Sequence, residues 1–293
     1  MEIVASIKST LPANHISCQH QDLPEPMLYY IKKNADPKLQ LKLMQTSKYF
    51  RFKEFPYFVI KDFEFISKTK GYAYHKSFTL FELDITKISK KLWLTGSLSI
   101  ECDDVDAVSQ FIENVAVCEI TSLSLNRQLL TVDEFKFLCN ELKQELCMFD
   151  SIIINENFDV VPLENILENV TSLEDLYFEF DYDNAENVTT ESTNKIIKAL
   201  SKLNLSLLYL SNIPENFDID ENRQTRFVLK FDEYISDDCV QKLRKYVDKL
   251  LDGGLLNRYP VLLEFQNQNY KDFVRLVQNM NTFSMRRQLD GYM

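Results

Sequence analysis

Glycine and histidine are both scarce in this chain, and their scarcity argues against several kinds of catalytic site. Only 5 of the 293 residues are glycine, whereas loops that bind nucleotides need glycines so that backbone N–H groups can approach phosphate. The Gly253–Gly254 pair follows an expected helix, which is the position of a helix C-cap. All 3 histidines precede residue 76, and no Gly-x-Ser-x-Gly turn occurs, so a hydrolytic triad is poorly supported.

Long apolar runs are also missing. No stretch approaches the roughly 20 apolar residues that a membrane-spanning helix needs. Residues 1–7 lack the basic start and the apolar run of a secretory signal. We therefore expect no membrane partner and a cytoplasmic or nuclear location.

Clustered metal ligands and paired cysteines are absent as well. The 6 cysteines are scattered without a Cys-x-x-Cys pair, which favours buried free thiols in a reducing compartment. Cys18 and His20 are close enough to share a metal, but no second pair of ligands follows. We expect neither a zinc site nor a cofactor.

Net positive charge is lacking: 44 acidic residues outnumber 33 basic ones, which gives a formal charge of -11. This balance argues against a nucleic-acid partner, because binding to the phosphate backbone depends on clustered Lys and Arg. The chain is instead rich in aromatic residues, which alternate with acids in Phe178–Asp181. Core packing explains most of them, but acids and tyrosines exposed on a strand face could bind a basic protein partner.

Paired acids are the remaining candidates for chemistry, because two nearby carboxylates can bind a hard cation or transfer protons. All of them fall in turns or at helix starts, where Asp accepts hydrogen bonds from free N–H groups. We favour structural capping and expect no enzymatic activity. The pairs are Asp103–Asp104, Asp181 with Asp183, Asp218 with Asp220, and Asp237–Asp238.

From residue 98 onward, short apolar strands alternate with amphipathic helices. The strands are expected at 98–100, 123–125, 152–154, 176–180, 207–210, 227–231 and 261–265. The helices are expected at 105–117, 132–142, 162–170, 191–203, 236–251 and 270–280, with a short or missing one at 218–222. Thr131 and Glu134 have the spacing of a capping box. The period of about 25 to 35 residues is typical of βα repeats such as leucine-rich repeats.

These observations predict an α/β fold with an irregular, leucine-rich-repeat-like array of βα units at 98–293. An open doubly wound sheet also fits the alternation. We prefer the stacked array because glycine-rich βα turns are missing. Ahead of it we expect an N-terminal arm at 1–20, a helical unit at 21–60 and a connecting segment at 61–97. Within that segment, 78–83 has mixed character and could form a short helix.

The helical unit holds two patterns that each start at a proline. Pro24 opens the first pattern, in which Met27, Leu28 and Ile31 follow at helical spacing, with Asp22 as a candidate cap. Pro37 opens the second pattern, whose apolar stripe includes Leu39, Leu41 and Leu43. Pro56 closes the unit.

Residues 22–56 resemble an F-box: a Leu-Pro pair, an apolar helix, a proline-started helix rich in leucine, and then Ser47-Lys48-Tyr49-Phe50. Over about residues 20–255 the chain is also similar to a family of F-box-like proteins expanded in nematodes. Val160–Glu164 and Ile213–Asp220 carry that similarity beyond the helical unit. The family is mostly uncharacterised.

The resemblance implies a non-catalytic adaptor that docks to the Skp-type subunit of a cullin–RING ubiquitin ligase and presents a substrate on its repeats. It places the docking contact on Leu23, Pro24, Met27, Leu28, Ile31, Pro37, Leu41 and Leu43. One departure supports an alternative: Phe50-Arg51-Phe52 stands where an F-box usually has a Trp and further apolar residues. In that alternative the protein is an interaction scaffold without a ligase role, and its helices only cap the repeat array.

Overall fold

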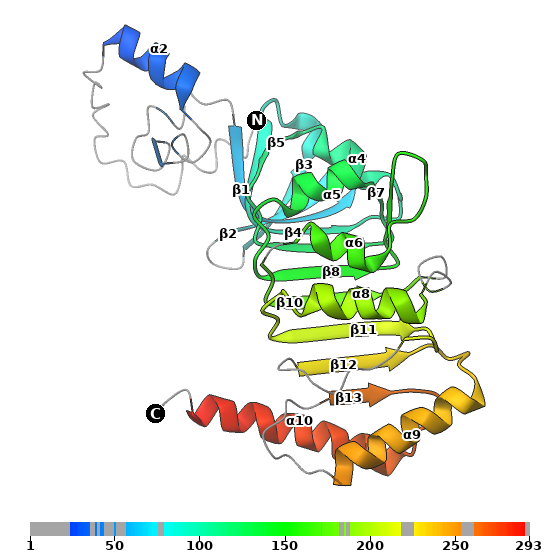
Figure 1. Ribbon diagram of the computed structural model, residues 1–293. Helices are drawn as coiled ribbons and strands as arrows, with labels where there is room; N and C mark the ends of the chain where they lie inside the picture. The colour runs from blue at the N-terminus through cyan, green and yellow to red at the C-terminus, as the bar shows by residue number, and fades with distance from the viewer. Residues whose placement is uncertain are drawn as a thin grey trace. The chain divides into compact units, whose positions relative to one another are not determined.

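The computed structural model divides the chain into two compact units, Met1–Pro56 and Tyr57–Met293 (Figure 1). It describes residues 24–35, 39, 42–43, 50, 57–75, 79–170, 172–181, 185, 188–217, 226–252 and 261–290. The predicted arm at 1–20 lies outside these residues. None of the described helices is both long and apolar enough to cross a membrane.

In the first unit, helix α2 spans Glu25–Asn34. It begins directly after Pro24, whose backbone is extended (φ -56°, ψ 143°), and it has no side-chain cap at that residue. The predicted cap Asp22 lies outside the described residues. Leu39, Lys42 and Leu43 are helical, as expected for the second helix, and the remainder of that helix is likewise outside.

The second unit is built on one large, mostly parallel sheet, which confirms the mixed α/β class. The described residues form 11 strands in the order β13-β12-β11-β10-β8-β6-β4-β1-β2-β3, with β5 also pairing β4. Only the β1–β2 and β2–β3 pairs are antiparallel. The strands are β1 (Tyr57–Ser67), β2 (Lys70–His75), β3 (Thr79–Asp84), β4 (Lys91–Glu101), β5 (Val115–Cys118), β6 (Ser122–Asn126), β8 (Glu145–Phe149), β10 (Asp175–Glu179), β11 (Leu207–Ile213), β12 (Arg226–Phe231) and β13 (Val261–Glu264).

From β4 to β13 the strand order follows the sequence without reversal. A doubly wound sheet reverses its order at a switch point, and no such reversal occurs within the array from β4 onward. The order reverses between β1 and β4, next to the antiparallel strands β2 and β3. When successive strand–helix–strand crossovers have the same hand and add strands in the same direction, their helices lie over the same face of the sheet. Figure 1 shows α5, α6 and α8 over one face of the strands. The helices are α4 (Ala107–Ile112), α5 (Val132–Cys139), α6 (Leu163–Glu168), α8 (Thr190–Leu200), α9 (Asp237–Asp252) and α10 (Tyr270–Asp290), and a 3₁₀ turn, η2, spans Ile85–Lys87.

The core lies between this helical layer and the sheet. In β6, for example, Leu123 and Leu125 are fully buried, whereas Ser122, Ser124 and Asn126 are half-buried on the opposite face. The same alternation recurs in β10 and β12. We call the face that carries the half-buried residues the open face. Each buried leucine contributes about 1.5–3 kcal/mol through removal from water, so this alternation sets which side of each strand meets the helices.

A polar ladder joins successive turns at the carboxyl ends of β4, β6 and β8. The Gln128 amide nitrogen donates to the Cys102 carbonyl (2.8 Å), and the Ser151 hydroxyl accepts from the Gln128 backbone N–H (3.1 Å). Gln128 and Ser151 are both buried. Arg127 and Asp150, the residues just before them, both have left-handed backbones (φ 55° and 46°). Hydrogen bonds between residues at corresponding positions therefore join the three successive turns.

A small second sheet follows these turns and corrects one strand assignment. Here β7 (Leu129–Thr131) pairs in parallel with β9 (Ile152–Ile154). The predicted strand at 152–154 is present as β9, but the strand of this βα unit in the main sheet is β8 at Glu145–Phe149, which the sequence pattern missed. In β8 the residues between Glu145 and Phe149 are buried on both faces, so the alternation that marks a strand is missing. Three consecutive isoleucines gave the stronger local signal.

Residues 61–97, expected as a connecting segment, supply most of β1, all of β2 and β3, and the start of β4. Residues 79–84, expected in part as a short helix, form β3 because they pair with β2 along its length. The expected helix at 105–117 ends earlier, since Val115–Cys118 form β5. Trp93 is fully buried in β4, and its indole donates to Glu119 (3.2 Å).

Two local predictions are confirmed. Thr131 and Glu134 form a complete capping box at the start of α5. The described cysteines are free and buried: Cys102, Cys118, Cys139, Cys147 and Cys239. Cys18 and the possible helix at 218–222 lie outside the described residues.

Candidate functional site

Helix α2 carries most of the predicted docking residues that the structure describes. Pro24 and Met27 are exposed, Met27 by 53%. Leu28 is buried, and Ile31 and Leu43 are half-buried. Leu23, Pro37 and Leu41 lie outside the described residues. The predicted set is therefore split: Leu28 packs inward, and Pro24 and Met27 face solvent.

Two exposed tyrosines extend this surface beyond what the sequence pattern indicated. Tyr29 and Tyr30 are 65% and 67% exposed. Pro24, Met27 and Tyr30 are three residues apart, so they follow one side of the helix. In the sequence, the apolar stripe through Leu28 and Ile31 indicates the inward side of the helix. The tyrosines next to that stripe are the signal from which the exposed side could have been found. We call Pro24, Met27, Tyr29 and Tyr30 the α2 surface.

The second candidate is the open face of the sheet, where strand register sets side chains in rows. Asp62, Ser97, Ser122, Glu145, Asp175, Leu207 and Arg226 are register partners in one such row. The next row joins Glu64, Ser99, Ser124, Cys147, Tyr177, Tyr209, Val228 and Leu262. Neighbouring residues in a row lie about 4.8 Å apart across the strands.

At the β1–β4 end of the open face, hydroxyl groups hold the carboxylates. The Tyr74 hydroxyl donates to Glu64 (2.6 Å), and this bond raises the pKa of Tyr74. The backbone N–H and hydroxyl of Ser97 both donate to Asp62 (3.1 Å each). Hydroxyl and backbone donors therefore hold both acids at this end of the face, and the Lys61 ammonium also lies 3.6 Å from Asp62.

In the middle of the open face, acids flank a pair of tyrosines. Tyr177 and Tyr209 pack with ring centroids 5.8 Å apart and a tilt of 33°. Glu145 and Asp175 are register partners on β8 and β10. On this face they form the row just before the row of Tyr177 and Tyr209. Glu179 lies two residues after Tyr177 and accepts from the Asn212 amide (2.9 Å). We call Glu145, Asp175, Tyr177, Glu179 and Tyr209 the acid–tyrosine face.

The surroundings of Asp175, Tyr177 and Glu179 on this face disfavour their ionisation. Burial, and then the neighbouring Glu174, raise the pKa of Asp175. Burial, and then Asp150, raise the pKa of Glu179. Burial also raises the pKa of Tyr177. Each cause is a cost of holding negative charge at this surface, which a bound cation would reduce.

Cations on this face are concentrated on β12. Lys230 lies 3.7 Å from Glu264 on β13. Arg226 is in the same row as Asp175, one strand beyond Leu207, and its charge partly offsets the rise in the Asp175 pKa. The open face is thus acidic over β8 and β10 and mixed over β12.

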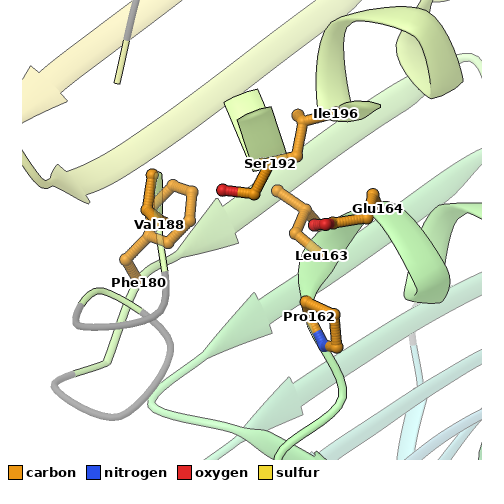
Figure 2. A pocket seen from close by; sticks show the side chains of 7 residues that line it. All are labelled: Pro162, Leu163, Glu164, Phe180, Val188, Ser192 and Ile196. Carbon is orange, nitrogen blue, oxygen red and sulfur yellow. The ribbon is translucent and has the colours of Figure 1, made fainter. Parts of the chain in front are cut away.

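A small hollow, potential metal ligands and buried thiols are the remaining features on which chemistry could depend. Figure 2 shows a small hollow with room for about one water molecule, lined by Pro162, Leu163, Glu164, Phe180, Val188, Ser192 and Ile196. No three His, Cys, Asp or Glu residues in the described ranges are grouped to hold a metal ion. Burial raises the pKa of Cys118 to about 11 and that of Cys147 to about 12, which keeps both thiols protonated and unreactive near neutral pH.

Of the acid pairs, Asp104 forms an ion pair with Lys68 (2.5 Å) and accepts a hydrogen bond from the backbone N–H of Asp106 (3.3 Å). Asp237 and Asp238 occupy the first turn of α9. These positions agree with structural capping. Asp183, Asp218 and Asp220 lie outside the described residues.

Comparison with known proteins adds no assignment: no family model matches the chain, and no curated protein matches it significantly. The α2 surface and the acid–tyrosine face are therefore the features from which a function can be inferred.

Proposed function

We propose that this protein is a non-catalytic interaction adaptor, an F-box-like substrate receptor for a Skp–cullin–RING ubiquitin ligase. The observation that carries the proposal is the α2 surface. Met27, Tyr29 and Tyr30 are each more than half exposed on a helix of 10 residues. Large apolar and aromatic side chains gathered on one exposed helix mark a protein-interaction surface.

The second unit supports the proposal as the substrate-binding part, an irregular leucine-rich-repeat-like array. Its parallel strands follow one another in sequence order from β4 to β13. Hydrogen bonds from Gln128 to the Cys102 carbonyl and to the Ser151 hydroxyl link equivalent turns of neighbouring βα units. Stacked units of this kind form extended surfaces suited to protein binding.

In this function the chain carries out no chemistry. The α2 surface holds the Skp-type adaptor, and the array holds a protein substrate, so the ligase meets the substrate at a raised effective concentration. Neither a cofactor nor a metal is needed for this mechanism.

The test is capture of a purified Skp-type adaptor by the full chain. We expect Met27→Asp/Tyr30→Asp to weaken binding by at least about 30-fold, because it places charges in the centre of an apolar contact. Tyr234→Asp is the matched control, since Tyr234 is 92% exposed in the second unit. Wild type that fails to bind the adaptor, or a control that loses binding equally, would contradict the proposal.

One observation favours the scaffold alternative. Leu28 is only 9% exposed and Ile31 is half-buried, so part of the predicted docking stripe already packs within the protein. In that case the helices only cap the array and no ligase subunit binds. A partner that binds the full chain equally well in wild type and in Met27→Asp/Tyr30→Asp, with no adaptor recovered, is the result that this alternative predicts.

A further inference from the structure

Two carboxylates lie side by side on the acid–tyrosine face without a cation in contact. Glu145 on β8 and Asp175 on β10 are register partners, so their backbones are about 4.8 Å apart. Among the described residues, no ion pair includes either carboxylate. Like charges opposed across two strands are destabilising, and a cation bound between them would remove that cost.

An aromatic platform lies next to these carboxylates. Tyr177 and Tyr209 are half-buried, with ring centroids 5.8 Å apart. Cys147 and Val228 are their register partners on the outer sides, so the row is apolar across β8 to β12. Tyrosine rings in such a row can pack an aliphatic or aromatic side chain and can also stack on a guanidinium group.

Along β10, acidic and aromatic side chains alternate on this face at a regular spacing. Asp175, Tyr177 and Glu179 share a face at a period of two residues, which is about 6.7 Å. An extended peptide presents alternate side chains at the same period. A segment lying along β10 can therefore oppose acid, aromatic and acid with three alternate side chains of its own.

We propose that the acid–tyrosine face binds an extended basic segment of a protein substrate, in the pattern basic-x-apolar-x-basic. Its cations lie over Glu145 with Asp175 and over Glu179, and its apolar side chain packs on Tyr177 and Tyr209. The inference rests on the proposed function, because it names the class of substrate that the receptor presents. A nucleic acid is a poor occupant, since its phosphates would meet these carboxylates.

The experiment measures binding of fluorescent nine-residue peptides to the purified full chain by anisotropy. The probe contains Arg-Ser-Leu-Ser-Arg, a second peptide has Glu in place of both Arg, and a third has the order Arg-Arg-Leu-Ser-Ser. We expect saturable binding of the first peptide, weakened several-fold between 50 and 300 mM NaCl, as ion contacts at a surface require. The other two should bind at least about tenfold more weakly.

The variant Glu145→Gln/Asp175→Asn should lose at least about tenfold in affinity for the first peptide, and so should Tyr177→Ala. The control Glu168→Gln/Glu191→Gln changes the net charge equally on helices α6 and α8, and it should bind as wild type does. Thermal unfolding checks that each variant is folded, and the amide replacements keep the size of the acids.

Several results would overturn the inference. One is an absence of saturable binding of the first peptide to wild type. Another is binding of the Glu peptide as tight as that of the first peptide. A third is a loss of affinity in Glu168→Gln/Glu191→Gln equal to that in Glu145→Gln/Asp175→Asn. Equal binding of the reordered peptide would refute the proposed spacing. The assay contains no Skp-type adaptor, so a negative result here combined with adaptor capture through α2 refutes the substrate class alone.

Discussion

Gln128 offers the sharpest test of how neighbouring βα units are held together. Its side chain is 2% exposed, and its amide nitrogen lies within hydrogen-bond distance of the carbonyls of Cys102 (2.8 Å), Asn126 (2.9 Å) and Arg127 (3.1 Å). The bond to Cys102 joins two turns that are 26 residues apart in sequence. We predict that Gln128→Ala destabilises the second unit.

The magnitude follows from the contacts. An amide has two N–H groups, so about two of the three hydrogen bonds are strong, and each lost bond that leaves a buried carbonyl unpaired costs about 1–3 kcal/mol. The Gln128 amide oxygen has no partner among the described residues, so its removal returns about 1 kcal/mol. The net loss in free energy of unfolding is therefore about 1–5 kcal/mol.

The assay is urea and thermal unfolding followed by circular dichroism. For a unit of this size each kcal/mol lowers Tm by about 2–4 °C, so we expect a decrease of about 2–20 °C. Gln144→Ala is the control, because Gln144 is exposed and its side-chain oxygen accepts from the hydroxyls of Thr121 and Ser122 rather than from a buried group. A loss below about 1 kcal/mol, or one equal to that of the control, would refute the role of the ladder in joining the units.

Two further predictions concern strand packing and pH. Gly96→Ala should cost about 1–3 kcal/mol or more in free energy of unfolding, because the new Cβ would lie 2.3 Å from the Lys61 carbonyl oxygen, a backbone atom that cannot rotate away. Ser99→Ala on the same strand is the control, and equal stability of the two variants in urea unfolding would contradict this explanation. Asp175→Asn should stabilise the fold by about 0.5 kcal/mol at pH 7, a modest value because the group is half-exposed and partly screened by solvent. The sign follows from the raised pKa of Asp175: the folded state holds its proton to higher pH than the unfolded state, so the stability contributed by this group falls as pH rises through that interval. The advantage of the Asn variant should therefore vanish below the unfolded pKa of about 3.9, and an advantage that grows on acidification would contradict it.

Some elements could be predicted because their cause is local. The Thr131–Glu134 capping box depends on residues three apart, and the amphipathic helices α5, α6, α8 and α9 follow from periodic apolar positions. Strands failed where the local signal was ambiguous. In β8 the alternation is lost because both faces are buried, and β3 is a strand because of its pairing with β2 rather than its own pattern.

The α/β alternation, the buried free thiols and the acidic balance follow from the sequence alone, because composition and short-range periodicity control them. Which residues share a surface depends instead on tertiary packing. Glu145 and Asp175 are 30 positions apart in sequence, and Tyr177 and Tyr209 are 32 apart, yet strand register makes each pair neighbours. Register depends on how whole βα units stack, and that sum of contacts is not visible in any single stretch of sequence. The same holds on α2, because only packing separates the buried Leu28 from the exposed Met27 and Tyr30.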